Sequence, residues 1–291
     1  MQARRWNTLY RLVNEVAATL PRGSRRFADR VIVLVLLWAA FQHKPISWAV
    51  QRGNWMPWMQ RLLPVLPSST TMSRRLRRGS VRVFLDRLLE RAQEALPASL
   101  VRVIDGTGLE IRNHSKDRQA DVGYSAGRRA KGYRLHLLLQ GRGRVAAWRL
   151  SPMSTNEKVM ALRMLREQPQ LAYVLADGNY DSNLLHATVT ERGGQLVAPR
   201  RVSHRRRQRW QTPGRTRCSE MLEGASEFGR QLFRARSAIE RFFGHADSHS
   251  EAMGELPAWV RTHRRVRLWI HAKLIINAVR ISLLNEQAKA A

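Results

Sequence analysis

Residues 100–106 read LVRVIDG, an apolar stretch with strand-like alternation that ends in Asp105 and a glycine. Two stretches of the same kind follow, Tyr133–Gln140 (YRLHLLLQ) and Val145–Leu150 (VAAWRL), and the short segment GRGR joins them. Alternating apolar residues bounded by glycine are typical of β-strands, and a short glycine-containing connection is typical of a hairpin. The three stretches therefore predict a meander of three strands.

Helices and strands alternate after the meander. The pattern predicts a helix over 156–167 with Asn156 as its cap, a strand over 172–176, a helix over 182–192 and a strand over 195–198. The complete order is β–β–β–α–β–α–β, a meander followed by crossover units. This is the strand order of a ribonuclease H-like fold, so we expect an α/β domain in which helices flank a mixed sheet.

The residues before the first strand have a different pattern. Their apolar side chains recur at three- and four-residue intervals, which is typical of helices, and prolines divide the segments. We therefore expect an all-α N-terminal domain over 1–98 and the α/β domain over 99–288. The most apolar stretch, Val31–Phe41, is well short of the roughly 20 residues that span a bilayer, so it predicts a buried helix. It also lies too far from the N-terminus to be a signal peptide.

The charge balance points to a polyanionic partner. The 291 residues include 51 Lys and Arg against 22 Asp and Glu, which gives a net charge of +29. Such an excess opposes compact folding by self-repulsion, and nucleic acid is the first explanation for it, ahead of an acidic membrane surface. The single cysteine, Cys218, excludes an internal disulfide and a cysteine-based metal cage, which fits a reducing cytoplasm.

Three basic segments predict where a nucleic acid would bind. Serines and threonines after Pro67 can cap a short helix whose exposed side is almost wholly arginine. Residues 200–222 predict a basic loop or insertion, and 256–284 predict a basic helical region. The residues expected to contact DNA in these segments are Arg74, Arg75, Arg77, Arg78, Arg205, Arg206, Arg207, Trp210, Arg264 and Arg265. A solvated linker helix and a loop with only nonspecific affinity remain alternatives for the first two segments.

Two acids follow apolar strands in a chain that has few acids. Asp105 comes directly after Val101–Ile104 and Asp177 directly after Tyr173–Ala176, and a glycine follows each. Residues just past strand ends face the ligand crevice of an α/β sheet. Two-metal phosphodiester chemistry needs oxygen ligands of this kind, which Mg²⁺ prefers. Either Asp-Gly pair alone could be ordinary turn chemistry, but the two together in this strand order favour a metal site.

A third acid, Glu240, lies in a predicted helix over 228–244. Phe233 and Arg236 fall on the same stripe of that helix as Glu240, beside an apolar stripe, so Glu240 would lie at the edge of the buried face. From there it could reach a metal at the rim of the sheet, and Arg236 could contact a neighbouring phosphate. The alternative is an ordinary surface pair of Arg236 and Glu240, four residues apart on a helix.

The segments that contain these acids resemble a known family. VRVIDGTGLE (101–110), LADGNYDS (175–182) and FRARSAIERFF (233–243) resemble the DDE transposases of bacterial insertion sequences, in the group typified by insertion sequence 4. The stretch 131–145, with Lys131 and Arg134, resembles the second and third strands of that family. In the family's Tyr–Arg–Glu–Lys helix signature, Arg236 and Glu240 match, whereas Phe233 stands at the Tyr position and Asp247 at the Lys position.

The resemblance implies an enzyme and its partners. It implies a DNA transposase that hydrolyses the ends of a mobile element and joins each 3′-hydroxyl to target DNA. Asp105, Asp177 and Glu240 would hold two Mg²⁺ or Mn²⁺ ions, and Arg236, Lys131 and Arg134 would contact DNA. It further implies a homodimer or larger assembly on the terminal inverted repeats, an N-terminal domain that recognises those ends, and a cytoplasmic, nucleoid-associated protein. A ribonuclease H-like nuclease that cleaves without joining and a non-catalytic nucleic-acid-binding relative remain alternatives.

Overall fold

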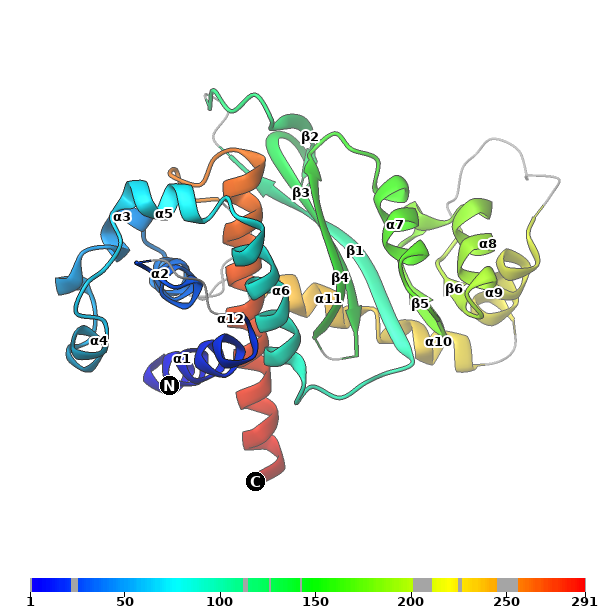
Figure 1. Cartoon of the computed structure of the whole chain (residues 1–291). Coiled ribbons are helices and arrows are strands. Elements are labelled where there is room, and N and C mark those ends of the chain that lie inside the picture. The colour runs from blue at the N-terminus through cyan, green and yellow to red at the C-terminus, as the bar shows by residue number, and fades with distance from the viewer. Residues whose placement is uncertain are drawn as a thin grey trace. The chain divides into compact units, whose positions relative to one another are not determined.

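The computed structural model divides the chain into two compact units. It describes residues 2–21, 26–111, 115–125, 127–141, 143–200, 211–224, 227–244 and 256–290. The first unit is helical and contains residues up to Leu96 together with residues from Pro257 onward. The second unit contains the sheet and extends from Pro97 to Gly244 (Figure 1).

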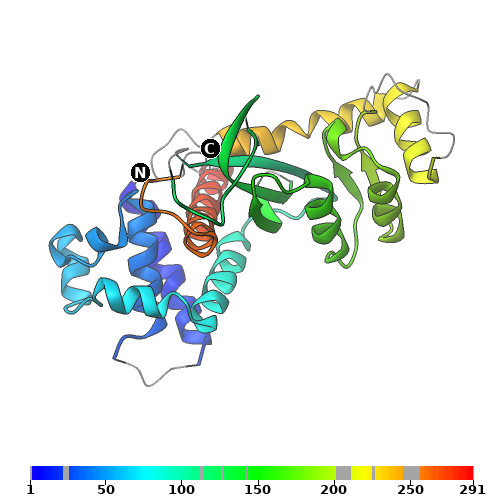
Figure 2. The same ribbon diagram turned by 90° about the horizontal axis from the view of Figure 1, so that it is seen from above.

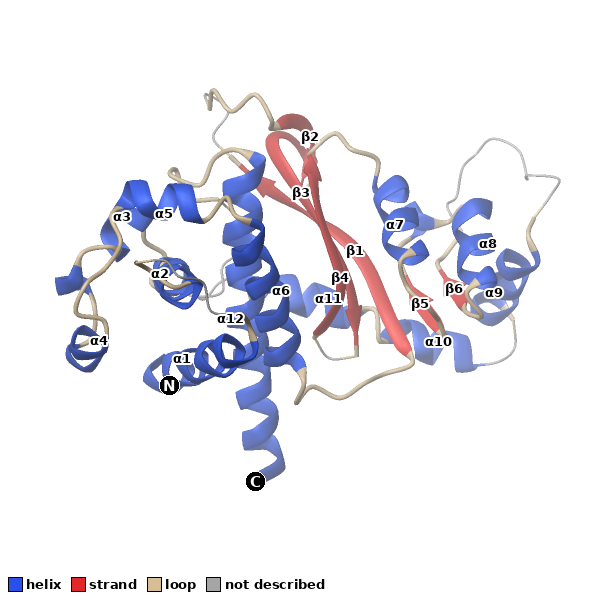
Figure 3. Ribbon diagram, in the orientation of Figure 1, coloured by secondary structure: helices blue, strands red, loops and turns tan. Residues whose placement is uncertain are grey.

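In the part of the helical unit that the structure describes, there are one long C-terminal helix and seven shorter elements (Figure 3). They are α1 (Gln2–Thr19), α2 (Asp29–Phe41), α3 (Ile46–Ala49), η1 (Arg52–Asn54), α4 (Pro57–Leu62), α5 (Ser69–Arg75), α6 (Gly79–Gln93) and α12 (His263–Ala290). Helix α12 packs against α6, α2 and α1. The structure thus places the end of the chain with the N-terminal helices, whereas the sequence assigned it to the α/β domain.

Helix α2 forms the centre of this unit. All its residues from Ile32 to Phe41 are buried, as expected for a helix that is apolar on every side. The rings of Trp6 and Trp55 pack on Trp38, with centroid separations of 4.7 and 5.3 Å. The prediction of a buried helix is therefore confirmed. Among the described residues, no helix is long and apolar enough to cross a membrane.

Among its described residues, the sheet unit has six strands and six helical elements. The strands are β1 (Val101–Glu110), β2 (Asp121–Ser125), β3 (Arg128–Gln140), β4 (Arg144–Pro152), β5 (Tyr173–Leu175) and β6 (Gln195–Val197). The helices are α7 (Glu157–Arg166), η2 (Gly178–Tyr180), α8 (Asn183–Glu191), α9 (Pro213–Glu223), α10 (Glu227–Arg234) and α11 (Ser237–Gly244).

The sheet has the mixed topology that the sequence predicted. Its strand order is β2-β3-β1-β5-β6, and β4 pairs with β3 on the same side as β2. Strands β1, β3 and β4 are antiparallel, whereas β5 and β6 join them in parallel. The expected order is therefore confirmed, with two differences. Strand β2 was not predicted, and β1 does not stop at Asp105 but continues to Glu110, antiparallel to β3.

Helices cover the sheet on two sides (Figure 2). Helices α7 and α8 bury an apolar cluster against one face, in which Leu138 of β3, Met164 of α7 and Val189 of α8 meet. Helix α11 packs on β1 from the other side and buries Ile239 and Phe242. Helices thus lie against both sides of the sheet, α7 and α8 against one face and α11 on β1 from the other.

The chain after the last strand differs from the local pattern in two places. Residues 213–222, part of the segment predicted as a basic loop or insertion, lie in α9, which begins with Pro213 at a position that favours a helix start. The helix expected over 228–244 is broken at Ala235 and Arg236 into α10 and α11. On α11, Ile239 and Phe242 are buried, whereas Phe243 is only half-buried.

Candidate active site

The sheet brings Asp105 and Asp177 to the same edge. Strands β1 and β5 are parallel, with Val103 paired to Leu175. Asp105 lies two residues beyond Val103, and Asp177 lies two residues beyond Leu175. The two acids therefore leave this parallel pair at equivalent positions on neighbouring strands, which are about 4.8 Å apart in a sheet.

Asp105 lies in the middle of β1, yet it faces the end of the neighbouring strand β5 as a strand-end residue would. It stays paired with Leu137 of β3 on its antiparallel side, while its parallel neighbour β5 has already ended. The sequence prediction that both acids share one edge was right in its result. Its premise, that the first strand ends at Asp105, was wrong.

A pocket of about 940 Å³ opens at this edge. Four acids line it, Asp105, Asp177, Glu110 and Glu157. The other lining residues include Asn179, Tyr124, Arg128, Arg129 and Arg134. The described lining residues supply four carboxylates against three guanidinium groups, which makes the pocket locally acidic in a chain with a net charge of +29. Such a concentration of oxygen donors favours a cation.

The acids of this pocket repel one another. The pKa of Asp105 is raised to about 6, first by burial and also by the negative charges of Asp177 and Glu157, against the opposing effects of the Gly106 N–H and of Arg236. Gly106 N donates to Asp105 Oδ1 at 2.8 Å, and Asn179 N donates to Asp177 Oδ1 at 2.8 Å. Both carboxylates are thus oriented by backbone donors, while their mutual repulsion would be relieved by a bound cation.

Glu157 is a pocket acid that the sequence analysis missed. It is the first residue of α7, directly after the Asn156 cap, and forms an ion pair with Arg134 of β3. Burial raises its pKa, and the charge of Asp177 acts in the same direction. A signal was present in the sequence: an acid in the first turn of a helix that follows the meander. That signal is common at helix starts, so it does not by itself indicate a site.

Glu240 does not line the pocket. Its side chain is 55% exposed and pairs with Arg236, one turn earlier. Arg236 is closer to the site, since its charge acts on Asp105. The structure therefore shows the surface pair that the sequence analysis kept as an alternative, on a helix that does contact β1.

The oxygen donors of the pocket suit a hard divalent cation. Asp105 and Asp177 supply carboxylates, Asn179 supplies an amide, and the volume leaves room for bound waters, which Mg²⁺ retains. Among the described residues, no three His, Cys, Asp or Glu side chains are close enough together to hold an ion as they stand. Side chains would have to move to complete such a site.

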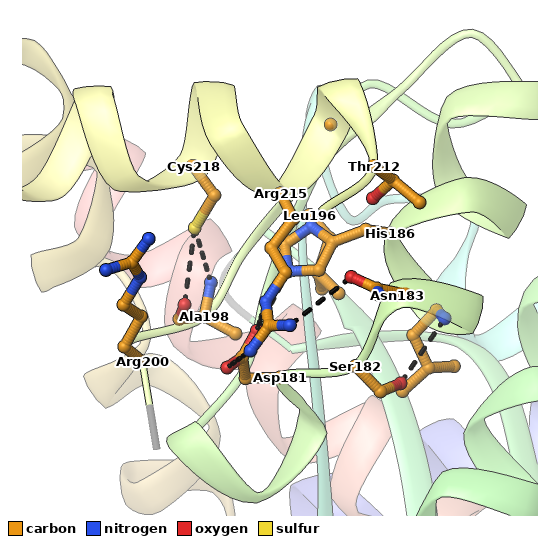
Figure 4. Close-up of polar contacts among 12 residues, drawn as sticks. Asp181, Ser182, Asn183, His186, Leu196, Ala198, Arg200, Thr212, Arg215 and Cys218 are labelled. Carbon is orange, nitrogen blue, oxygen red and sulfur yellow. Dashed lines mark hydrogen bonds and ion pairs between the residues drawn. The ribbon is translucent and has the colours of Figure 1, made fainter. Parts of the chain in front are cut away.

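The loop after Asp177 is anchored by a buried ion pair (Figure 4). Arg215 of α9 donates to both carboxylate oxygens of Asp181, at 2.8 and 2.6 Å. His186 of α8 lies 3.3 Å from the same carboxylate. Figure 4 shows these side chains converging between α8 and α9. Asp181 follows Asp177 by four positions along the chain, so this pair fixes the segment that positions the second acid.

A comparison with known families decides what kind of protein contains this site. A family model described as "Transposase DDE domain" matches residues 97–277, which is more than half of the chain. The chain belongs to this transposase family. The match confirms the predicted transposase and, with it, DNA as the partner. No curated protein and no solved structure gave a significant match.

The transposase presents only part of its predicted arginine helix to solvent. Arg74 lies exposed on α5, and Arg77 and Arg78 are exposed between α5 and α6. The prediction that Arg75 contacts DNA is corrected, because Arg75 is buried, pairs with Asp29 and donates to the carbonyl of Phe27. It links the start of α2 to α5 and is therefore not free to contact DNA.

The other predicted DNA contacts lie in both units. Lys131 is half-buried on β3 and donates to the carbonyl of Ser115 at 2.7 Å. Arg134 lines the acidic pocket of the transposase and is paired with Glu157. In the helical unit, Arg264 and Arg265 are exposed at the start of α12. Arg205, Arg206, Arg207 and Trp210, like Asp247, lie outside the described residues.

Arg264 and Arg265 line a second pocket, of about 290 Å³, within the helical unit. Lys44 lines it too, as do Ser69 and Ser73 of α5, and Trp259 and Trp269. None of the described residues that line it is acidic. Two segments that the sequence singled out as basic, α5 and the start of α12, thus meet around one pocket.

Proposed function

We propose that this transposase cleaves the ends of a mobile element and joins them to target DNA, at a metal site on Asp105 and Asp177. The observation behind the proposal is the parallel register of β1 and β5, which brings the two acids to one edge of the sheet. The acidic pocket and the family match both fit this chemistry. The proposed group is the insertion-sequence type typified by insertion sequence 4.

Two Mg²⁺ or Mn²⁺ ions would supply the chemistry that carboxylates lack, which is to activate the attacking oxygen and to neutralise charge on the phosphate. Asp105 and Asp177 would bind them, with their oxygens oriented by the N–H groups of Gly106 and Asn179. Arg129, which lines the same pocket, would bind the phosphates beside the cut. The residues of the chain would thus bind and orient the ions and the DNA, and the acidic pocket would concentrate the ions.

Glu240 remains a proposed third metal ligand. To serve as one, it would have to leave Arg236, and Arg236 would then be available for a phosphate. Binding of DNA would favour this exchange, because a phosphate competes with the Glu240 carboxylate for the guanidinium group. The exposed position of the pair makes the exchange inexpensive, since exposed ion pairs contribute little to stability.

The helical unit is proposed to recognise the element ends. Its cations Arg74, Arg77, Arg78, Arg264 and Arg265 are exposed and would contact DNA phosphates. Base contacts, which phosphate contacts cannot replace, would come from side chains near them. The working assembly would be a homodimer or larger, because two element ends must be held together for joining.

The experiment incubates the full chain with linear DNA bearing the element ends, a supercoiled target plasmid and Mg²⁺. We expect products covalently joined to the target, and we expect the Asp105→Asn variant to bind DNA as the wild type does but to give no product. Cleavage without joining would instead indicate a nuclease. Identical behaviour of wild type and variant would show that Asp105 takes no part in catalysis.

A further inference from the structure

We propose that Glu157 is a further carboxylate ligand of the metal site, held by Arg134 until a cation takes the place of the guanidinium group. The inference rests on the proposed function, since it concerns the same site. It adds a residue that neither the aspartate pair nor the late helix provides.

The position of Glu157 is the first argument. It begins α7, and its side chain lines the pocket that Asp105 and Asp177 line. The Asn156 side chain accepts from the backbone of Lys158 at 2.9 Å, so the cap fixes where the helix starts and therefore where Glu157 points. A ligand at the first turn of a packed helix is well oriented, because α7 is anchored on β3 and β4.

The electrostatic interactions are the second argument. The charge of Asp177 acts on Glu157, and the charge of Glu157 acts on Asp105. The charges of the three carboxylates thus act on one another across the shared pocket, although the side chains are not close enough together to hold an ion as they stand. This repulsion disfavours the ionised forms in a partly buried pocket, and a cation placed among the three acids would relieve it.

Arg134 is the cation that fills this role in the structure. It pairs with Glu157 and also donates to the carbonyl of Tyr124, while its Nε is buried without a hydrogen-bond partner. The side chains of Arg134 and Glu157 are 13% and 20% exposed. A guanidinium group with an unsatisfied buried donor is a less complete partner for the cluster than a hydrated metal ion would be. The pair therefore resembles a counter-ion arrangement that a metal can replace.

Glu157 and Glu240 differ in how ready they are to bind a metal. Glu157 already lines the acidic pocket, whereas Glu240 is more than half exposed and lies outside the lining. For a metal ion bound before DNA arrives, Glu157 therefore needs the smaller movement. The two acids make different predictions for metal binding in the absence of DNA.

The experiment measures Mn²⁺ binding to the full chain without DNA, from the loss of the free-ion electron paramagnetic resonance signal. The variants are Glu157→Gln, Glu240→Gln and Asp105→Asn. Glu110→Gln is the matched control, because Glu110 lines the same pocket but pairs with Arg128. We expect Glu157→Gln and Asp105→Asn to weaken binding by about tenfold or more, a loss at least as large as outer-shell changes cause. We expect the two other variants to stay within about threefold of the wild type.

A double variant tests whether Glu157 binds the metal itself or only neutralises the charge of Arg134. Glu157→Gln alone leaves the Arg134 charge beside the site, which would itself repel Mn²⁺. Arg134→Gln combined with Glu157→Gln keeps the net charge of the pocket unchanged and keeps both shapes. If Glu157 is a ligand, the double variant stays weak. Recovery of wild-type affinity would overturn the inference, because only the uncompensated arginine would then have mattered.

The outcomes distinguish this inference from the proposed function. If Asp105→Asn loses Mn²⁺ and Glu157→Gln retains it, Glu157 is not a ligand and the aspartate site stands. If Asp105→Asn retains Mn²⁺, or the wild type binds none, the proposed metal site fails and the inference fails with it. A thermal melt of each variant, followed by circular dichroism, shows that the weakened variants are still folded.

Discussion

The two pockets of this transposase use the same residue type, arginine, in opposite ways. In the sheet unit, Arg134 pairs with Glu157 and Arg128 with Glu110, so these cations compensate pocket acids. In the helical unit, Arg264 and Arg265 line a pocket without acids, and no ion pair among the described residues involves them. The net charge of the whole chain does not reveal this difference between the two pockets.

The difference teaches how a chain of charge +29 can attract both DNA and a cation. Unpaired surface arginines contribute to the long-range field that draws a polyanion, as a net positive charge does. The few acids act at short range, where a low-dielectric pocket strengthens their attraction for a cation. The comparison predicts that changes in the acidic pocket alter chemistry and stability, whereas changes in the basic pocket alter only affinity for DNA.

The largest expected effect is on chemistry. Asp177→Asn should lower the rate of DNA cleavage by at least about 10³-fold, because several kcal/mol of transition-state charge stabilisation depend on the bound metal. The dissociation constant for DNA should stay within about twofold, since this acid contributes nothing to phosphate binding. A cleavage assay and a fluorescence-anisotropy titration measure the two quantities. A large loss of DNA affinity would break the division between the pockets.

The next largest effect is on stability. It compares a largely buried, paired arginine of α9, Arg215, with an exposed one, Arg217. Arg215→Met should destabilise the protein by about 3 kcal/mol or more, because it leaves the buried Asp181 carboxylate without its cation. Arg217→Met, on the exposed side of α9, should change stability by less than about 0.5 kcal/mol. Urea unfolding of the two variants checks this. Equal effects would mean that the buried pair does not anchor the second acid's loop.

A third effect is a gain in stability with a defined pH dependence. The pKa of Asp105 is raised to about 6 in the folded protein, so its ionisation disfavours folding as pH rises from about 4 through about 6. Asp105→Asn should therefore stabilise the metal-free protein by on the order of 1–3 kcal/mol at pH 7.5. Below pH 4 the gain should vanish, because the carboxyl is then neutral in both states. Melting temperatures at both pH values, measured with a chelator present, test the sign.

The smallest effect concerns the basic pocket. Arg264→Gln and Arg265→Gln should each reduce the slope of log affinity against log salt by about 0.9, one counterion per lost phosphate contact. The paired Arg128→Gln should change the slope less, because its charge is already opposed by Glu110. DNA-binding titrations at several salt concentrations measure the slopes. Equal slopes for all three variants would erase the contrast between paired and unpaired cations.

Much of the fold was predictable from local pattern. The strand order, the buried helix at Val31–Phe41 and the helix start at Asn156 were all confirmed, because each depends on residues close in sequence. Errors arose where a residue's structure depends on a partner far away in the sequence. Strand β1 continues past Asp105 because β3 pairs with it, and Arg75 is buried because Asp29 of another helix receives it.

The candidate site divides in the same way. The sequence identified Asp105 and Asp177, because an acid after an apolar strand is a local signal. It missed Glu157, because an acid in the first turn of a helix is ordinary until the packing of α7 brings it to a pocket. It also predicted one continuous helix for Glu240, whereas the chain breaks at Ala235 and Arg236 and leaves that acid exposed.

By itself, the sequence determined the class of fold, the sign of the partner and two of the acids, since periodicity, net charge and residue type are properties of the chain alone. Only the tertiary structure decided which acids share a pocket and which arginines are paired. Those facts depend on distances between elements far apart along the chain, and electrostatic interactions change steeply with distance and burial.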